Sequence, residues 1–240
     1  LTREPDDSGA SFWTSQITTC ATDPGCTEVK RIDTSAAFFL SIEFQQTGFL
    51  VYRTYTASFG PNRVGGTVPL TLREFLPDTQ QIGRDFIVGE GDWQTQIEAN
   101  KQAYFAEFVQ RPAFEAFYPR AMTAAAFVDA LNTNTGGSLS QGERDSLVSR
   151  LDAGIETRAT ALRRVAEDAD LRDREVSRAF VLMQYFGYLQ RNPNEGQDTD
   201  FSGYNFWLSK LNQFGGDFRR AEMVKAFIVS QEYRQRFGRP

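Results

Sequence analysis

The chain has 240 residues, of which 40% are hydrophobic and 13% aromatic, and its formal net charge is −5. This composition is typical of a globular protein and too apolar for a disordered chain. An acidic chain lacks the cationic surface from which nucleic-acid affinity mainly comes, so we expect no nucleic-acid partner. Histidine is absent, which excludes histidine-dependent nucleophilic catalysis, histidine metal ligands and histidine pH switches. No apolar stretch approaches the ~18–20 residues of a membrane span.

Apolar residues at helical spacing dominate the first half of the chain. The first predicted helix begins around Phe12, and the second covers residues 29–46, which residues 49–59 could continue. Residues 68–89 give a mixed pattern, in which we expect a helix that Pro77 interrupts and a short extended piece that contains Ile87. The last predicted helix of this half covers residues 93–110.

The second half of the chain has clearer helix starts. Pro112 suits the first turn of one helix and Thr123 begins the next. Ser140 and Glu143 have the spacing of a capping box. Because residues 180–189 are apolar nearly all round, we expect a buried central helix there. The predicted helices from the capping box onward cover residues 140–151, 157–168, 171–189, 204–211 and 221–237.

Cys20 and Cys26 flank a short segment that contains Asp-Pro-Gly, a strong turn signal. A turn brings the two thiols together, so we expect a disulfide, with a pair of free cytosolic thiols as the alternative. Two cysteines without a histidine or further cysteines make a poor zinc site. A disulfide implies an oxidising compartment, which predicts a secreted, extracellular or cell-surface protein.

The two ends of the chain are self-similar, and this is the most informative feature of the sequence. Residues 8–17 match residues 202–211, with a shared Gly, Phe-Trp and Ser at corresponding positions. A second matching segment follows each copy, at residues 37–44 and 226–233, and weaker copies lie between the two ends. The unit is a short helix with Trp or Leu, a turn and a longer helix with an apolar stripe. Neighbouring units must pack together to bury those stripes.

These units predict an all-α protein, an array of helix-turn-helix repeats packed into one compact multi-helix bundle. We expect an N-terminal repeat with a disulfide insertion at residues 1–60, a degenerate middle segment at 61–120 and two C-terminal repeats at 121–240, within one continuous domain. Residues 1–5 match residues 189–193, which end the predicted buried helix. The N-terminal repeat is therefore expected to lack its leading helix and to present an uncovered apolar groove, a typical interaction site.

The repeated aromatic residues and acids each allow two interpretations. Trp13 and Trp207 could form a ligand platform, but their matching apolar surroundings favour core or interface anchors. We expect the same role for the phenylalanines of the two copies, Phe12, Phe38, Phe39 and Phe227. Catalysis usually needs one asymmetric constellation, so we assign no catalytic residue. Instead we expect a local hydrogen bond or an arginine to hold each of the repeated acids, Glu43, Glu167 and Glu232.

Asp198 and Asp200 precede the predicted helix at residues 204–211. Clustered carboxylates could bind calcium there, but the ligand spacing of an EF-hand is missing. We favour N-capping, in which the side chains accept hydrogen bonds from free backbone N–H groups, and we expect no metal and no cofactor. The acidic and basic residues that alternate over residues 163–178 favour a solvated, salt-bridged helix surface.

The C-terminal motif consists of Arg191-Asn192-Pro193, Gly203 with Phe206-Trp207, Ala226-Phe227-Ile228 and Ser230-Gln231-Glu232-Tyr233. It resembles the bacterial domain-of-unknown-function family 4214, a domain at the end of large secreted acidobacterial proteins, and more distantly the helical linker domains of phycobilisomes. The resemblance covers residues 124–237 and, as a partial copy, residues 1–55. Gln190 stands where the family usually has Gly, and the loop at residues 194–200 is longer than typical. The resemblance implies an extracellular helical assembly module with no established catalytic residues.

Together these observations predict a non-enzymatic extracellular structural or interaction module that self-assembles into a surface layer or fibre by helix packing between copies. The expected partners are other copies of the chain or the rest of a longer parent chain, with no membrane span. One alternative is a carbohydrate-binding module, whose candidate exposed aromatics are Tyr52, Tyr55, Tyr104 and Tyr118. A second alternative is a carboxylate-dependent glycoside hydrolase, which requires two facing acids.

Overall fold

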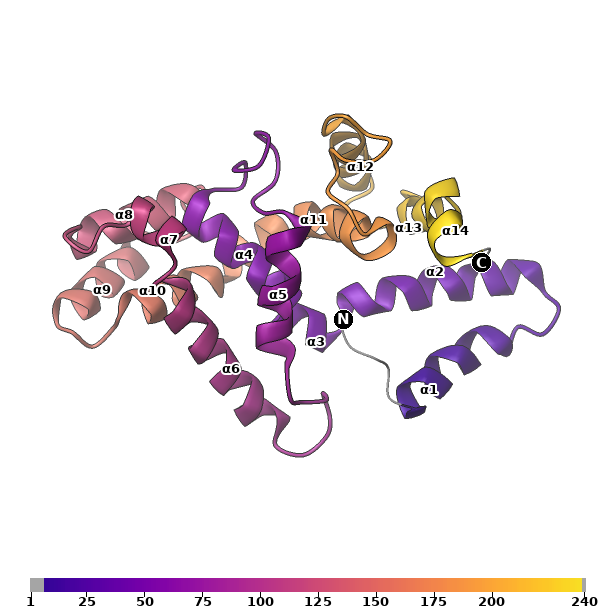
Figure 1. Cartoon of the computed structure of the whole chain (residues 1–240), viewed down its shortest axis with the longest axis horizontal. Helices are drawn as coiled ribbons and strands as arrows, with labels where there is room; N and C mark the ends of the chain where they lie inside the picture. Colours follow the sequence, from indigo (N-terminus) through magenta and orange to yellow (C-terminus); the bar gives the residue numbers. More distant parts are fainter. Residues whose placement is uncertain (1–6, 239–240) are drawn as a thin grey trace. The chain divides into compact units, whose positions relative to one another are not determined.

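The computed structural model describes residues 7–238 and shows an all-α chain (Figure 1). Within this range there are fourteen α-helices, one π-helix and no β-strand, so the predicted fold class is confirmed. The β-type contact in the described part is an isolated bridge between Val64 and Val68. None of the described helices is long and apolar enough to cross a membrane. The ordering of the helices as a repeat array stays a prediction.

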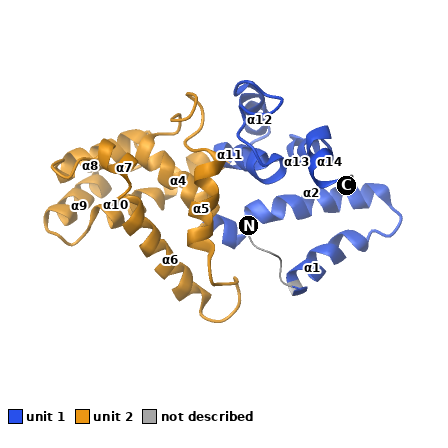
Figure 2. Cartoon of the chain, viewed as in Figure 1, with its two compact units in different colours: residues 1–45, 177–240 blue, residues 46–176 orange. Residues whose placement is uncertain are grey.

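The helices group into two compact units (Figure 2). Unit 1 comprises residues 1–45 and 177–240, and unit 2 comprises residues 46–176. The boundaries at 60 and 120 expected from the sequence do not coincide with this division, because the first and last parts of the chain belong to the same unit. Helix α11 (Ala169–Gln184) begins in unit 2 and ends in unit 1.

The helices of each unit are as follows. Unit 1 contains α1 (Asp7–Thr18), α2 (Pro24–Leu40), most of α3 (Ile42–Gln46), the end of α11, the π-helix η1 (Tyr185–Leu189), α12 (Ser202–Gln213), α13 (Met223–Ile228) and α14 (Gln231–Phe237). Unit 2 contains α4 (Gly48–Phe59), α5 (Leu72–Gly83), α6 (Trp93–Phe108), α7 (Pro112–Phe117), α8 (Ala124–Asn134), α9 (Gln141–Asp152), α10 (Arg158–Ala166) and the start of α11.

Helix α4 is a separate helix rather than a continuation of the preceding one, and it forms the core of unit 2. Residues 48–58 are all buried, and the helix packs against α5, α8 and α10. Two of its buried hydroxyls bond within the helix, because those of Thr54 and Thr56 each donate to the carbonyl oxygen four residues earlier, at 2.9 and 3.0 Å. The Arg53 guanidinium lies 4.7 Å from the centroid of the Phe49 ring, and burial lowers the pKa of Arg53 to about 10.

Several helix starts predicted from the sequence are confirmed. The Ser140 hydroxyl accepts a hydrogen bond from the Glu143 N–H at 3.4 Å, and the Glu143 carboxylate accepts one from the Ser140 N–H at 2.8 Å. These two bonds complete the capping box of α9. The Thr123 hydroxyl accepts from the N–H of Ala126 at the start of α8, and Pro112 is the first residue of α7. Local capping chemistry therefore sets these boundaries.

Two of the predicted long helices are each broken at a serine. The helix expected over residues 29–46 is divided between α2 and α3 at Ser41, and the helix expected over 221–237 is divided between α13 and α14 at Ser230. Both serines have an extended backbone, with ψ of 153° and 151°. Each hydroxyl also accepts a hydrogen bond, at 3.1 Å, from the backbone N–H three residues later. Each serine thus ends one helix and caps the next.

Pro77 does not interrupt α5, so this expectation is wrong, and residues 86–88 lie outside any helix and form no β-strand. Proline lacks an N–H, so the carbonyl of Arg73, four residues earlier, loses its helical partner. Arg73 and Pro77 are both exposed to solvent, where water can bond to that carbonyl. The buried residues of α5 hold the helix in place on its other side, and they are Phe75, Asp78, Thr79 and Ile82.

The helix predicted over residues 171–189 begins at Ala169 and ends in the π-helix η1. Residues 181–186 are all buried, as their apolar sequence predicts. Gln190 closes the helix in the left-handed conformation, with φ of 48°, and its N–H donates to the Tyr185 carbonyl. Glycine adopts this conformation most easily, which is consistent with the Gly expected here from the family resemblance.

Candidate interaction surface

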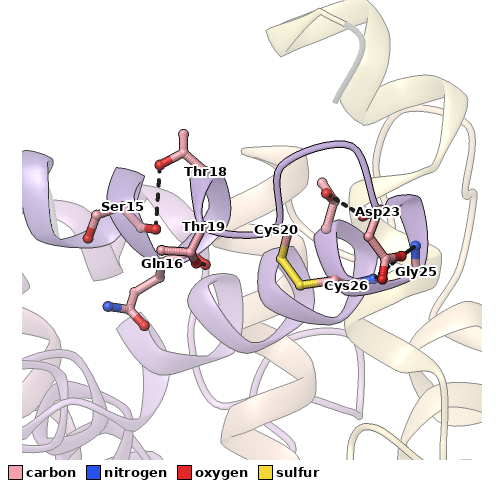
Figure 3. Close-up of a disulfide and its surroundings, with 9 residues drawn as sticks. Ser15, Gln16, Thr18, Thr19, Cys20, Asp23, Gly25 and Cys26 are labelled. Atoms are coloured by element: carbon pink, nitrogen blue, oxygen red, sulfur yellow. Dashed lines mark hydrogen bonds between the residues drawn. A yellow bond between two sulfur atoms is a disulfide. The ribbon is translucent and has the colours of Figure 1, made fainter.

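Helices α1 and α2 form a helical hairpin in unit 1, and a short disulfide loop connects them (Figure 3). The sulfur atoms of Cys20 and Cys26 lie 2.00 Å apart, at disulfide-bond distance, as predicted. The Asp23 carboxylate accepts hydrogen bonds from the backbone N–H groups of Gly25 and Cys26, at 2.9 and 3.1 Å. The loop therefore fixes the start of α2 both covalently and by capping.

Replacing both cysteines with serine is expected to lower the free energy of unfolding by about 2 kcal/mol, because closing so short a loop removes only modest entropy from the unfolded chain. Urea unfolding in the presence and absence of reductant measures this loss. The reductant should shift the midpoint of the natural chain and leave that of the double-serine variant unchanged. A midpoint of the natural chain that does not respond to reductant would contradict the bridge.

An aromatic cluster joins α1 to α2. The ring centroids of Phe12 and Trp13 lie 5.0 Å apart with an interplanar angle of 77°, and those of Trp13 and Phe38 lie 5.2 Å apart. Phe12 is 55% exposed, whereas Trp13 and Phe38 are half-buried. We call these three residues the N-terminal aromatic cluster.

The matching residues of α12 and α13 form a C-terminal aromatic cluster of Phe206, Trp207 and Phe227. The ring centroids of Phe206 and Trp207 also lie 5.0 Å apart at 77°, and those of Trp207 and Phe227 lie 5.8 Å apart. Phe206 is 57% exposed. The neighbouring Phe and Trp thus have the same edge-to-face geometry at both ends of the chain. In both clusters the tryptophan contacts the phenylalanine of the following helical segment.

The two clusters differ in what covers the phenylalanine of the second segment. Phe227 is only 4% exposed, because Tyr185 and Tyr188 of η1 pack on it with ring centroids 5.1 and 6.4 Å away. Phe38 contacts Trp13 and is half-buried. The N-terminal aromatic cluster is therefore the less covered of the two.

Phe39 anchors α2 on η1. Its ring centroid lies 5.4 Å from that of Tyr188, and a Cβ atom placed on Gly187 would lie 2.6 Å from the Phe39 ring. Only glycine therefore allows this approach without a shift of the ring. An ion pair of 2.7 Å between Lys225 and Glu28 also ties α13 to α2. The second helix of the hairpin is thus held in unit 1, and α1 packs on it.

Three further apolar side chains of α2 and α3 are exposed. Val29, Leu40 and Ile42 have exposed fractions of 54%, 53% and 59%. Leu40 directly precedes the helix break at Ser41. The apolar periodicity predicts that a residue at the position of Leu40 is buried. Because the helix breaks at Ser41, the Leu40 side chain is exposed instead.

Arg191 holds two acids, Glu232, for which a local hydrogen bond or an arginine was expected, and Asp198, for which N-capping was expected. Its Nε and Nη2 groups donate to the carboxylates of Glu232 and Asp198, each at 2.7 Å. Burial alone would lower the pKa of Arg191, but these hydrogen bonds raise it. Asp198 is therefore an ion-pair residue and not a cap, whereas Asp200 accepts from the Ser202 N–H at 2.8 Å, as expected of a cap. Within residues 7–238 no group of three His, Cys, Asp or Glu residues could hold a metal ion.

The charged stretch at residues 163–178 is only partly a solvated surface. Glu167 accepts a hydrogen bond from Arg163 at 3.0 Å, in line with the expectation that an arginine holds it. Glu175, however, is buried and accepts a hydrogen bond from the Tyr52 hydroxyl at 2.8 Å. The stretch therefore also turns one carboxylate toward the core of unit 2.

The tyrosines expected to bind carbohydrate are buried, so this expectation is wrong. None of the four is more than 5% exposed, and they are Tyr52, Tyr55, Tyr104 and Tyr118. Their hydroxyls find partners inside unit 2, as the bond from Tyr118 to the Ser58 carbonyl shows. A tyrosine at helical spacing gives the same pattern whether it faces solvent or core, which is why the sequence does not separate the two cases.

A hollow of about 450 Å³ beside α9 gathers acids, but each acid already accepts a hydrogen bond. Glu143 belongs to the capping box, and the bonds from Ser140 hold its pKa below the ordinary value. Glu167 accepts from Arg163, and Asp168 accepts from the Leu171 N–H at 3.0 Å. These three acids are therefore engaged in helix caps or an ion pair.

Comparison with known proteins gives no match to any protein family, curated protein or solved structure. The likeness to the domain-of-unknown-function family thus stays a prediction. The segment at residues 1–5, whose match to residues 189–193 led us to expect a missing helix, lies outside the described residues.

Proposed function

We propose that this chain is a non-enzymatic structural or interaction module of an extracellular protein and that it associates with other copies of itself by helix packing. The partly exposed N-terminal aromatic cluster supports this proposal. The disulfide-distance pair supports the extracellular location, since such bonds persist in oxidising compartments. The predicted family likeness implies the same kind of module.

The observation that carries the proposal is the exposure of aromatic rings in an ordered helical setting. Exposed apolar clusters tend to mark interaction sites, and burying them contributes about 25 cal/mol per Å² before the costs of association. Phe12 and Phe206 are both more than half exposed, at corresponding positions of the two clusters. Two attachment points in one chain are what an open assembly such as a layer or fibre requires.

Light scattering of the purified chain over a wide concentration range tests this function. The natural chain is expected to gain mass with concentration, and the double variant Phe12→Ser with Phe206→Ser is expected to remain closer to the monomer. Ile155→Ser is the matched control, because Ile155 is 65% exposed but belongs to unit 2. A natural chain that stays monomeric throughout, or a control that dissociates the assembly equally, would contradict the proposal.

No specific observation favours the two alternatives. Carbohydrate binding was expected to use four tyrosines that are buried in unit 2. Glycoside hydrolysis needs two facing carboxyl groups, and the acids of the hollow beside α9 take part in helix caps and an ion pair. The interaction module is therefore the function that the geometry supports best.

A further inference from the structure

Helices α1 and α12 present outward faces of the same kind. Both helices have twelve residues. In each, an exposed phenylalanine is followed three residues later by an exposed serine, and these pairs are Phe12 with Ser15 and Phe206 with Ser209. The two helices lie apart within unit 1 (Figure 2). A contact between the two faces therefore has to join two copies of the chain.

Charged side chains are rare on both helices. Although 24% of the chain is charged, the single charged residue of α1 is Asp7 and that of α12 is Lys210. The centres of protein interfaces are depleted of charged residues and enriched in aromatic ones. The two faces have this composition, because the exposed neighbours of their phenylalanines are Ser11, Ser15 and Thr19 on one side and Asn205, Ser209 and Gln213 on the other.

Three hydroxyls at the end of α1 already have hydrogen-bond acceptors within the chain. The Ser15 hydroxyl donates to the Phe12 carbonyl at 2.7 Å, and the Thr18 hydroxyl donates to the Ser15 carbonyl at 3.4 Å. The Thr19 hydroxyl donates to the Gln16 carbonyl at 3.1 Å. Burying a polar group costs most when it loses its hydrogen bonds. This face of α1 can therefore leave water at a small polar cost.

The single charges of the two helices are complementary in sign and in position. Asp7 lies in the first turn of α1 and Lys210 in the last turn of α12. Along the helix axes, Asp7 lies about 7.5 Å before Phe12 and Lys210 about 6 Å after Phe206. In an antiparallel pair with the two phenylalanines at the same level, the acid and the base also come level. A pair of two α1 or two α12 helices brings no such opposite charges together.

We propose that copies of the chain associate head to tail, with α1 of one copy packed antiparallel on α12 of the next. Phe12 then lies against Phe206, and Asp7 lies beside Lys210. This inference rests on the proposed self-association and names the two faces that meet. Because the contact joins two different faces, each copy can bind one neighbour on either side, as a filament or a closed ring requires.

Mixing two single variants tests which faces meet. Phe12→Ser keeps an intact α12 face, and Phe206→Ser keeps an intact α1 face. Both replaced side chains are more than half exposed, so we expect both variants to fold, which circular dichroism checks. At a concentration where the natural chain associates, light scattering is expected to show monomers for each variant alone. A one-to-one mixture is expected to form dimers and nothing larger.

The other outcomes of the mixing experiment separate this inference from the proposed function. A single variant that still associates on its own shows that like faces meet. That result overturns the inference and leaves the proposed function standing, as does a mixture that stays monomeric although the natural chain associates. A natural chain that is monomeric at every concentration overturns both.

Charge reversal tests the antiparallel pairing. Asp7→Lys and Lys210→Asp, each alone, are expected to weaken association about threefold at low salt, because like charges then meet. The double variant is expected to regain the affinity of the natural chain. Asp170→Lys is the matched control, because Asp170 is an exposed acid in the first turn of α11, and it should associate like the natural chain. A double variant as weak as the single variants overturns the inference.

Discussion

Replacing Phe227 with alanine is expected to lower the free energy of unfolding by about 3–5 kcal/mol, the usual range for a buried phenylalanine. Phe227 is 4% exposed, and three aromatic rings surround it at centroid distances of 5.1, 5.8 and 6.4 Å. Truncation leaves a cavity that these rings cannot fill in a close-packed core. Urea unfolding followed by circular dichroism and by tryptophan fluorescence measures the loss, because Trp207 is one of the three rings.

The chain supplies its own matched control for this experiment. Phe38 occupies the corresponding position of the N-terminal copy but is half-buried. Phe38→Ala is therefore expected to cost only about 1–2 kcal/mol, because less apolar area leaves contact and water can enter the space. An equal loss for Phe38 and Phe227 would mean that the N-terminal aromatic cluster is already covered in solution, and the proposed association through this cluster would lose its basis.

Replacing Asp78 with alanine is expected to lower the free energy of unfolding by about 2–3 kcal/mol, because the partly buried Arg111 guanidinium loses one of its two carboxylate partners and keeps Glu107. Asp78 is 4% exposed and accepts two hydrogen bonds from the Arg111 guanidinium, at 2.8 and 2.9 Å. The buried Tyr104 hydroxyl donates to the same carboxylate at 3.3 Å. Burial alone would lower the pKa of Arg111, but the hydrogen bonds to Asp78 and Glu107 raise it. Alanine removes the part of this compensation that Asp78 supplies and leaves the part that Glu107 supplies.

An exposed ion pair provides the control for the Asp78 experiment. Arg120 is 87% exposed in its pair with Glu115, whose charged groups lie 3.0 Å apart. Arg120→Ala is expected to change the free energy of unfolding by no more than about 1 kcal/mol, because solvent screens such pairs. Chemical denaturation of both variants under the same conditions gives the comparison. Similar small losses for Asp78 and Arg120 would show that the Asp78–Arg111 pair is not buried in solution.

Helix starts are the part of the fold that the sequence predicts best. The boundaries at Thr123 and Ser140 are confirmed because an N-cap depends on a side chain and a backbone group three residues apart, all visible in a short window. The disulfide-distance pair follows from an equally local signal, a turn between Cys20 and Cys26. Local chemistry therefore predicts where helices begin.

Helix ends and breaks depend on competing local signals. In the sequence, the apolar periodicity continues through Ser41 and Ser230. In the structure, the backbone of both serines is extended and each hydroxyl caps a new helix. The two serines occupy matching positions of the two copies. Testing each serine of the repeat as a possible N-cap could therefore have located both breaks. Conversely, Pro77 suggests a break that does not occur, since its exposed position lets water replace the missing hydrogen bond.

Burial in three dimensions is the part that periodicity cannot predict. Helix α4 is buried on every side although it contains Arg53, Thr54 and Thr56, because each of these side chains is satisfied within the helix. For the same reason, tyrosines that suggested a sugar-binding face lie inside unit 2. The candidate aromatic clusters were found from the repeat, but their unequal cover depends on η1, which only the folded chain shows.

The cross-link between Cys20 and Cys26 affects how readily the N-terminal hairpin can recognise another molecule. The disulfide closes a ring of seven residues between two cysteines at a sequence separation of 6. Because this ring joins the two helices, α1 has little freedom to move away from α2. Much of the ordering entropy is thus lost during folding rather than at the moment of encounter, so a preorganised surface meets its partner at a smaller entropic cost. For the proposed association between copies, we therefore expect oxidation of the two cysteines to raise affinity as well as stability.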